Sequence, residues 1–131
     1  MEKTTKQFKK RNAILSCLQA TRKHPSAEMV HEMLQQEHPD ISLATVYRNL
    51  ALFKNQGLIQ SLGTVNGIER FDANTQPHVH FICNDCYRVD DLPDMEIPRT
   101  LNDAADRCSG GHAEFCHLSF TGTCRECLNQ G

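Results

Sequence analysis

The 131-residue sequence predicts a two-domain α+β protein, in which a helical domain ending in a hairpin precedes a small α/β domain held together by cysteines. Two observations lead to this expectation. In the first half, apolar residues recur at helical spacing between clear helix-breaking signals. In the second half, two Cys-x-x-Cys pairs bracket residues 87–123, and only short apolar runs lie near them.

Three helices are expected in the first half. The first covers 6–18, where apolar residues face away from a strongly basic surface, and His24-Pro25 breaks the chain after it. Ser26 and Ser42 are the candidate N-caps of the second and third helices, since a serine hydroxyl can accept a hydrogen bond from the first helical turn. Gly57 is the expected stop of the third helix.

A β-hairpin is expected to follow these helices. Segments 58–62 and 68–71 read as strands and flank Asn66-Gly67, a pair that favours a tight hairpin turn. Three helices followed by a hairpin is the order of a winged helix-turn-helix, so we place this domain at 1–73. The polar, proline-terminated segment 74–77 is interpreted as a hinge.

The remaining residues, 78–131, are expected to form a small α/β domain. Segments 78–82 and 87–91 read as short strands around the first Cys-x-x-Cys turn. Helical spacing predicts a helix over 96–107, and 115–121 reads as a last strand before the second turn.

Charge is divided unequally along the chain, although the total is only −2. Cut after Arg70, the first part has ten Lys and Arg against six Asp and Glu, and the rest has four against ten, which gives +4 and −6. This division suits a protein that binds phosphate through one half and cations through the other. No apolar run approaches the roughly 18 residues of a membrane span, and no secretory signal opens the sequence, so we expect no membrane association and a cytoplasmic location.

The two Cys-x-x-Cys pairs, Cys83 with Cys86 and Cys124 with Cys127, predict a structural zinc site. Each short turn aims two sulfurs at one point, and tetrahedral zinc requires four such ligands. The alternatives are two disulfides or a redox pair, which an absent secretory signal and an absent βαβ pattern make less favourable. We expect the loss of any one of the four to unfold this half of the protein.

A second metal site is indicated by imidazole and carboxylate groups next to the first cysteine pair. His78 and His80 are alternate residues of a predicted strand and therefore point to one face. Asp72 precedes them, and Asp90 and Asp91 follow on the next strand. Imidazole with carboxylate suits divalent iron, manganese or zinc in a less thiophilic site than the cysteine cluster.

The other cysteines are less informative. Cys17 lies in the apolar stripe of the first helix, where a small buried hydrophobe is the favoured interpretation. Cys108 and Cys116, near His112 and His117, form either a further metal site, a redox contact or a chance grouping in a chain rich in both residue types.

Taken together, these residues resemble the ferric uptake regulator (Fur) family over about residues 11–127. The resemblance rests on the following segments: His24-Pro25, Ser42-Leu-Ala-Thr-Val-Tyr-Arg-Asn-Leu50, Arg70-Phe-Asp72, His78-Val-His80-Phe-Ile-Cys83-x-x-Cys86 and Gly122-Thr-Cys124-x-x-Cys127. It implies a non-enzymatic, metal-dependent repressor with zinc on the four cysteines and a regulatory ion on His24, Asp72, His78, His80 and Asp91. An ion that joins His24 to ligands beyond the hinge would favour one arrangement of the two domains.

Aspartate at both Asp72 and Asp91 is similar to the peroxide-stress regulator branch of this family. That resemblance implies Fe(II) or Mn(II) as the regulatory ion. It also implies that peroxide reacts with the iron-loaded form, that a ligand histidine is oxidised and that DNA is released. An iron-uptake or zinc-uptake regulator is the alternative within the family.

The third helix is expected to read double-stranded DNA. Its inward stripe consists of Leu43, Val46, Leu50 and Phe53. This stripe turns Thr45 and Arg48 outward and places Tyr47 at the shoulder, so Tyr47 and Arg48 are candidates for base reading, with phosphate contact as the alternative. The candidate phosphate contacts are Lys9, Lys10, Arg11 and the wing residue Arg70. A two-fold homodimer would place two such helices on a palindromic operator.

Two other classes of protein share some of these sequence features. Zinc nucleobase deaminases combine histidine with Cys-x-x-Cys, but they need a His-x-Glu, and this chain has Val79 and His80 after His78. A non-catalytic zinc-ribbon interaction module would explain the four cysteines. It would leave the histidines and aspartates without a common purpose.

Overall fold

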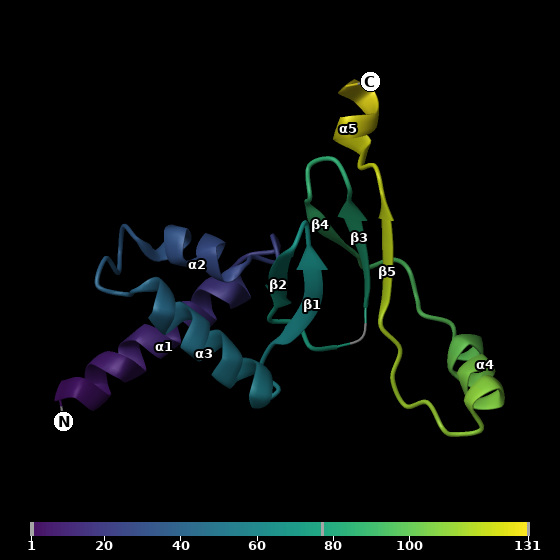
Figure 1. Ribbon diagram of the computed structural model, residues 1–131, viewed down its shortest axis with the longest axis horizontal. Coiled ribbons are helices and arrows are strands. Elements are labelled where there is room, and N and C mark those ends of the chain that lie inside the picture. The colour runs from purple at the N-terminus through teal and green to yellow at the C-terminus, as the bar shows by residue number, and fades with distance from the viewer. Residues whose placement is uncertain (1, 77, 131) are drawn as a thin grey trace. The chain divides into compact units, whose positions relative to one another are not determined.

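The computed structural model describes residues 2–76 and 78–130, which divide into two compact units. Unit 1 is Met1–Thr75 and unit 2 is Gln76–Gly131. Each unit contains its own sheet, two-stranded in unit 1 and three-stranded in unit 2 (Figure 1). Among the described residues, no helix is both long and apolar enough to span a membrane.

Unit 1 has the three helices and the antiparallel hairpin expected of a winged helix-turn-helix (Figure 1). The first helix extends beyond the predicted 6–18 in both directions, because neither glycine nor proline interrupts this stretch. The elements are α1 (Glu2–Ala20), α2 (Ala27–Leu34), α3 (Leu43–Asn55), β1 (Gln60–Val65) and β2 (Ile68–Asp72).

Local signals fix the ends of these elements as the sequence predicts. Ser26 Oγ accepts a hydrogen bond from Met29 N at 3.2 Å, and Ser42 Oγ accepts one from Thr45 N at 3.1 Å. Such serine caps contribute about 1 kcal/mol each to helix stability. The hairpin turn is Asn66-Gly67, where both residues have positive φ (54° and 77°), as a type I′ turn requires.

The core of unit 1 lies where the three helices meet β2. The inward stripe of α3 is buried as predicted at Val46, Leu50 and Phe53, while Leu43 is half-buried. The other buried members of the cluster are Ile14, Leu18, Ala27, Val30, Leu34, Ile41, Ile59 and Phe71. This packing orients the opposite face of α3 toward solvent.

Phe53→Ala is expected to lower the free energy of unfolding of unit 1 by about 3–5 kcal/mol, because it removes a fully buried aromatic ring and leaves a cavity. Denaturant titration followed by circular dichroism measures this loss. Phe8→Ala is the matched control, since Phe8 is 58% exposed and its removal should change stability by less than about 0.5 kcal/mol. Equal losses in the two variants would contradict the assignment of Phe53 to the core.

Unit 2 is a three-stranded mixed sheet with two helices (Figure 1). The strand order is β4-β3-β5, with β3 antiparallel to β4 and parallel to β5. In chain order the elements are β3 (Val79–Cys83), β4 (Val89–Leu92), α4 (Arg99–Ser109), β5 (Leu118–Gly122) and α5 (Arg125–Gln130).

The helices of unit 2 differ from the sequence prediction in two respects. Helix α4 lies later than the predicted 96–107, because Pro98 occupies the N-cap position and Gly110, with φ 74°, follows the last turn. Helix α5 was not predicted. It spans six residues, which is too short to show a helical period.

Unit 2 buries little apolar surface of its own. None of the residues of α4, all of which the structure describes, is buried, and this helix stands apart from the sheet (Figure 1). Leu101, Phe115 and Phe120 are all more than 40% exposed. A domain of this size and composition needs a metal or a partner surface to be stable.

Candidate metal centres and candidate nucleic-acid interface

Four thiols converge in unit 2, from Cys83, Cys86, Cys124 and Cys127. Their sulfur atoms all lie within 4.8 Å of one another, and none of the seven cysteines forms a disulfide. Cys83 Sγ lies 3.8 Å from Cys127 Sγ, and Cys86 Sγ lies 3.7 Å from Cys124 Sγ. A tetrahedron with zinc–sulfur bonds of about 2.3 Å has sulfur–sulfur edges of about 3.8 Å. The four thiols therefore fit tetrahedral zinc.

The strands of unit 2 bring the two cysteine turns together. Cys83 ends β3 and lies opposite Gly122, which ends the parallel strand β5. Asn84 N donates a hydrogen bond to the Gly122 carbonyl at 2.7 Å, so the chain segments that lead into each pair are joined directly. Tyr87, with φ 63°, closes the first turn by donating its N–H to the Cys83 carbonyl at 3.0 Å.

The cysteine cluster favours one thiolate strongly. Backbone N–H groups of Cys86, Cys124 and Asp85 donate to Cys83 Sγ and lower the pKa of this thiol to about 6. The pKa of Cys127 is raised, first by its hydrogen bond with Cys124 and then by burial. Four thiolates this close repel one another, so full ionisation requires a cation at their centre.

A second group in unit 2 consists of His78, His80 and Asp91. His80 lies directly opposite Asp91 in the β3–β4 register, and the His78 and His80 rings are 4.2 Å apart. His78 Nε2 is 3.1 Å from Asp91 Oδ1, and His80 Nε2 is 3.3 Å from the same oxygen. The alternation predicted from the sequence thus places both imidazoles on the face that carries Asp91.

This group has the donor chemistry of a divalent-ion site. His78 Nδ1 donates to the Gln76 carbonyl at 2.6 Å, so the neutral ring presents an unprotonated Nε2 toward Asp91. A ring lone pair and a carboxylate oxygen repel each other unless a proton or a cation lies between them. A carbonyl that fixes the tautomer from behind is also a common arrangement around metal-binding histidines. Fe(II), Mn(II) and Zn(II) all accept such ligands.

Asp90, the other aspartate that the sequence places nearby, belongs to a different environment. It lies opposite Phe81 in the strand register, on the other face of β4 from Asp91. Arg88 Nε lies 2.9 Å from Asp90 Oδ2, and Arg88 Nη1 lies 3.0 Å from Glu126 Oε2. Asp90 therefore helps Arg88 connect β4 with α5.

Unit 1 contains a buried pair of the same chemistry, His24 and Asp72. His24 Nδ1 lies 3.5 Å from Asp72 Oδ2, and both side chains are almost fully buried. Asp72 Oδ1 accepts a hydrogen bond from Asn74 N at 2.8 Å, which orients the carboxylate. Placing a charge in this interior is costly without a partner, so the pair is suited to hold a proton or a cation.

Arg70 was predicted to contact phosphate from the wing, but the structure buries this residue. It is only 8% exposed, and its Nη2 donates to the Lys23 carbonyl at 2.8 Å. Its Nε donates to the His24 carbonyl at 2.5 Å, and burial lowers the pKa of the guanidinium. The sequence does contain a signal for this position: Arg70 precedes Asp72 by two residues, and alternate residues of a strand share a face. Arg70 is therefore on the same face of β2 as the predicted metal ligand Asp72. Arg70 is therefore placed to order the chain around His24 and is poorly placed to meet DNA.

The outer face of α3 presents the residues that the sequence selects for DNA. Tyr47 is 48% exposed and its hydroxyl donates to Glu28 Oε1, a contact that sequence reasoning missed. Arg48 is exposed and its Nη2 donates to Thr45 Oγ1 at 3.1 Å. Because the Tyr47 hydroxyl is already hydrogen-bonded to Glu28, the edge of the ring is the part of this side chain that suits an apolar contact with a base.

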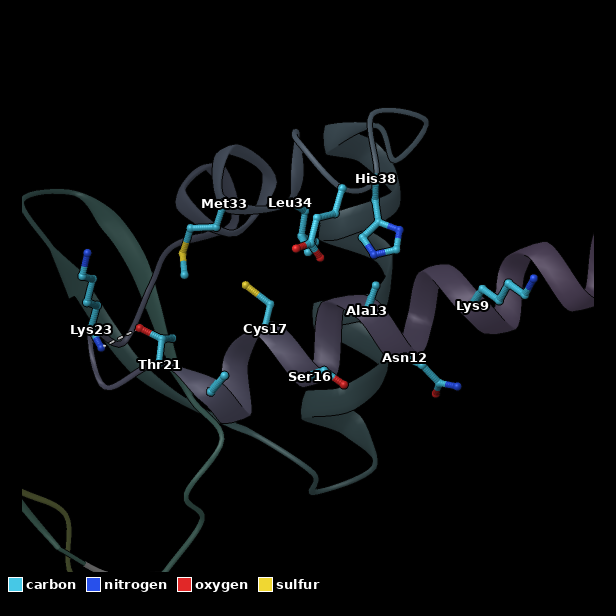
Figure 2. A pocket seen from close by; sticks show the side chains of 12 residues that line it. Lys9, Asn12, Ala13, Ser16, Cys17, Thr21, Lys23, Met33, Leu34 and His38 are labelled. Atoms are coloured by element: carbon cyan, nitrogen blue, oxygen red, sulfur yellow. Dashed lines mark hydrogen bonds between the residues drawn. The ribbon is translucent and has the colours of Figure 1, made fainter.

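The basic residues of α1 lie largely at the surface. Lys9 and Arg11 are exposed, and Lys10 Nζ is 3.8 Å from Asp40 Oδ2. Lys9 also lines a groove between α1 and α2, where Cys17 and Met33 point into the same space (Figure 2). Cys17 is half-buried against the core, and burial raises the pKa of its thiol. These positions leave Lys9 and Arg11 accessible to phosphate.

The remaining cysteines and histidines of unit 2 do not converge. Among the described residues, Cys108, Cys116, His112 and His117 form no group with the spacing of metal ligands. His112 Nδ1 instead lies 3.4 Å from Asp106 Oδ2, and the His117 ring packs against Phe115 with centroids 4.5 Å apart. The structure gives no support to a further metal site in this loop.

A winged-helix unit joined to a unit rich in metal ligands defines a class of protein, the metal-responsive transcriptional regulators. The particular family follows from sequence comparison. The model of the ferric uptake regulator family matches residues 2–115, and the chain belongs to that family. It is accordingly a transcriptional regulator and not an enzyme.

Relatives and solved structures agree with this assignment. A peroxide-responsive repressor PerR of Staphylococcus aureus (strain USA300) is 35% identical over 123 residues, which are 92% of this chain and 80% of the relative. The PerR of Staphylococcus epidermidis is 31% identical over 121 residues, with the same two coverages. The Campylobacter jejuni peroxide stress regulator has a similar fold, with a TM-score of 0.80 at 24% identity over 96% of this chain and 94% of that one. The Vibrio cholerae ferric uptake regulator gives a TM-score of 0.74 at 28% identity over 88% of each chain.

Proposed function

We propose that this protein is a metal-dependent transcriptional repressor that responds to peroxide. In this proposal it binds a palindromic operator in double-stranded DNA as a homodimer, and a regulatory Fe(II) or Mn(II) ion controls its affinity. The relatives named as peroxide-responsive repressors support the peroxide signal, since they match over nine-tenths of the chain. The observation that carries the metal dependence is the approach of two imidazole nitrogens to one Asp91 oxygen, at 3.1 and 3.3 Å.

The regulatory ion would be shared by the two histidine and aspartate groups. In unit 1, His24 and Asp72 form a buried pair that suits a cation, and in unit 2 His78, His80 and Asp91 form another. If one ion takes ligands from both groups, its binding energy favours one arrangement of the units. Residues 74–77, of which Pro77 lies outside the described part of the chain, would then act as the hinge between a DNA-binding domain at 1–73 and a dimerisation domain at 78–131.

Zinc on Cys83, Cys86, Cys124 and Cys127 would be structural in this proposal. The sulfur spacing supports this role, because all four positions of the tetrahedron are taken by protein ligands and none remains for a substrate. The ion would join the end of β3 to the start of α5. This would compensate for the small apolar core of unit 2.

Dimerisation is proposed through the apolar residues that unit 2 leaves exposed. Leu101 on α4 and Phe120 on the edge strand β5 are both 41% exposed. An edge strand and an uncovered helix are surfaces that a second copy can bury, and a symmetric pair suits a palindromic operator.

DNA binding is proposed through α3 and the basic face of α1. Thr45, Tyr47 and Arg48 lie on the solvent side of α3, where Arg48 can reach a guanine and Tyr47 a thymine methyl. Lys9, Lys10 and Arg11 are the proposed phosphate contacts, and they should make operator affinity fall steeply with salt. Arg70 is left out of this set because its guanidinium is buried.

The response to peroxide depends on which ion is bound. Fe(II) can supply electrons to peroxide, which Mn(II) does not do readily, so only the iron form should react. His24 and His78 are the proposed targets of oxidation, because both would be ligands of the ion. In the net reaction one peroxide oxygen would enter a C–H bond of the imidazole and the other would leave as water. An imidazole modified in this way is a poorer ligand. Oxidation of either histidine would thus release the ion and, with it, the proposed operator complex.

Operator titration with Mn(II), with Fe(II) and with no added metal, each before and after peroxide, tests this function. We expect either metal to raise operator affinity by roughly 5- to 150-fold, the usual range for coupled sites. Peroxide should reverse this effect with Fe(II) only and should add one oxygen to His24 or His78, as read by mass spectrometry. An iron form that stays unmodified and bound to DNA would instead indicate an iron-uptake regulator, and metal-independent binding would contradict the whole proposal.

A further inference from the structure

Arg70 is a buried charged residue that the proposed function leaves without a role. Two hydrogen bonds that Arg70 makes within unit 1 go to main-chain carbonyls, from Nη2 to Lys23 at 2.8 Å and from Nε to His24 at 2.5 Å. Burying a guanidinium is costly, and the interior of unit 1 would accept an apolar residue at lower cost. Both carbonyls belong to the turn at Lys23 and His24, which indicates that Arg70 supports the backbone of this turn.

The backbone at His24 is strained and needs external support. His24 has φ 51°, in the left-handed region that residues other than glycine seldom adopt. It also precedes Pro25, and a residue before proline is normally extended. Such a conformation persists only where neighbouring groups determine it. Here Arg70 donates to the Lys23 and His24 carbonyls, which belong to the two peptide groups that flank the His24 α-carbon. In addition, Phe71 N donates to the Pro25 carbonyl at 3.0 Å.

The direction of the His24 imidazole depends on this turn. With the backbone fixed, His24 Nδ1 lies 3.5 Å from Asp72 Oδ2. Arg70 and Asp72 are alternate residues of β2, so one strand supplies a carboxylate and also holds the turn that presents the imidazole beside it. The same turn leads directly to Ser26, the N-cap of α2.

We infer that Arg70 is a positioning residue that holds His24 in the conformation needed to ligate the regulatory ion. This inference rests on the proposed function for the identity of the ion, but the positioning of the imidazole is a property of unit 1 alone. Arg70 thereby joins β2 to the turn between α1 and α2 that carries the metal ligand. It does so from a buried position and without touching DNA.

Arg70→Met tests the inference, because methionine keeps an unbranched apolar stem and removes every donor. In the zinc-loaded, full-length protein we expect Mn(II) affinity, measured without DNA by the electron paramagnetic resonance signal of free Mn(II), to fall at least tenfold. We also expect the His24 ring signals in the nitrogen–proton spectrum of the metal-free protein to shift. Arg70→Lys, which retains one ammonium donor, should recover part of the Mn(II) affinity.

Ile41→Val is the matched control, since it weakens the core of unit 1 far along the chain from His24. It should leave both Mn(II) affinity and the His24 signals unchanged. If it lowers Mn(II) affinity as much as Arg70→Met does, the effect is one of general stability and the inference is overturned. If Arg70→Met does not fold, Mn(II) affinity and the His24 ring signals are measured on Arg70→Lys instead.

The salt dependence of operator binding separates this role from a phosphate contact. At saturating Mn(II), a positioning residue should leave the slope of log affinity against log salt unchanged, whereas the loss of a phosphate contact reduces it by about one. A reduced slope with unchanged Mn(II) affinity would overturn the inference. A wild-type protein without a second metal site would instead contradict the proposed function, and the His24 ring signals would still decide whether Arg70 positions that residue.

Discussion

Cys124→Ser is expected to abolish zinc binding and with it the folded state of unit 2. Cys124 Sγ lies 3.7 Å from Cys86 Sγ and is buried, so a serine hydroxyl would replace one of four converging sulfurs. Structural zinc in small domains contributes on the order of 10 kcal/mol to folding, and it does so only with its ligand set complete. Unit 2 has few buried apolar residues to replace that contribution.

Metal analysis and sedimentation of the purified variant measure this effect. We expect almost no retained zinc, loss of the proposed dimer and a weaker strand signal in circular dichroism, while the helices and the hairpin of unit 1 persist. Cys108→Ser is the matched control, because Cys108 is exposed and lies outside the cluster. A Cys124→Ser protein that remains dimeric and retains one zinc per chain would contradict the structural role of the cluster.

The features predicted from the sequence are those with local causes. Ser26 and Ser42 cap helices because a hydroxyl at that position meets an N–H three residues later. Asn66-Gly67 makes the hairpin turn because both residues tolerate positive φ. The cysteine pairs were equally clear, since each turn places its two sulfurs together whatever surrounds it.

Several features that depend on residues distant in the sequence were not predicted. The parallel pairing of β3 with β5 joins Cys83 to Gly122, and no local pattern encodes it. Arg70 was interpreted from its charge as a DNA contact, whereas its carbonyl partners come from a turn far away in the sequence. The Tyr47–Glu28 hydrogen bond likewise joins two helices. In each case the local pattern was compatible with several tertiary partners.

His80→Ala is expected to remove the response to metal while leaving the fold and zinc content intact. His80 is one of two imidazoles that approach Asp91 Oδ1, and it lies directly opposite Asp91 in the strand register. Its loss leaves His78 and Asp91 without the third group on that face. Because an ion shifts a conformational equilibrium only by its difference in affinity for the two states, a site with fewer ligands should give a smaller shift.

Operator affinity with and without saturating Mn(II) measures that shift directly. For the parent protein we expect roughly a 5- to 150-fold increase, and for His80→Ala we expect a ratio close to one. His112→Ala is the matched control, since His112 is exposed and paired with Asp106 away from this group. Asp91→Asn, which keeps the shape of the side chain but removes its charge, should reproduce the His80→Ala result. A His80→Ala protein that still responds fully to Mn(II) would contradict metal gating at this site, because the ion would then act elsewhere in the chain.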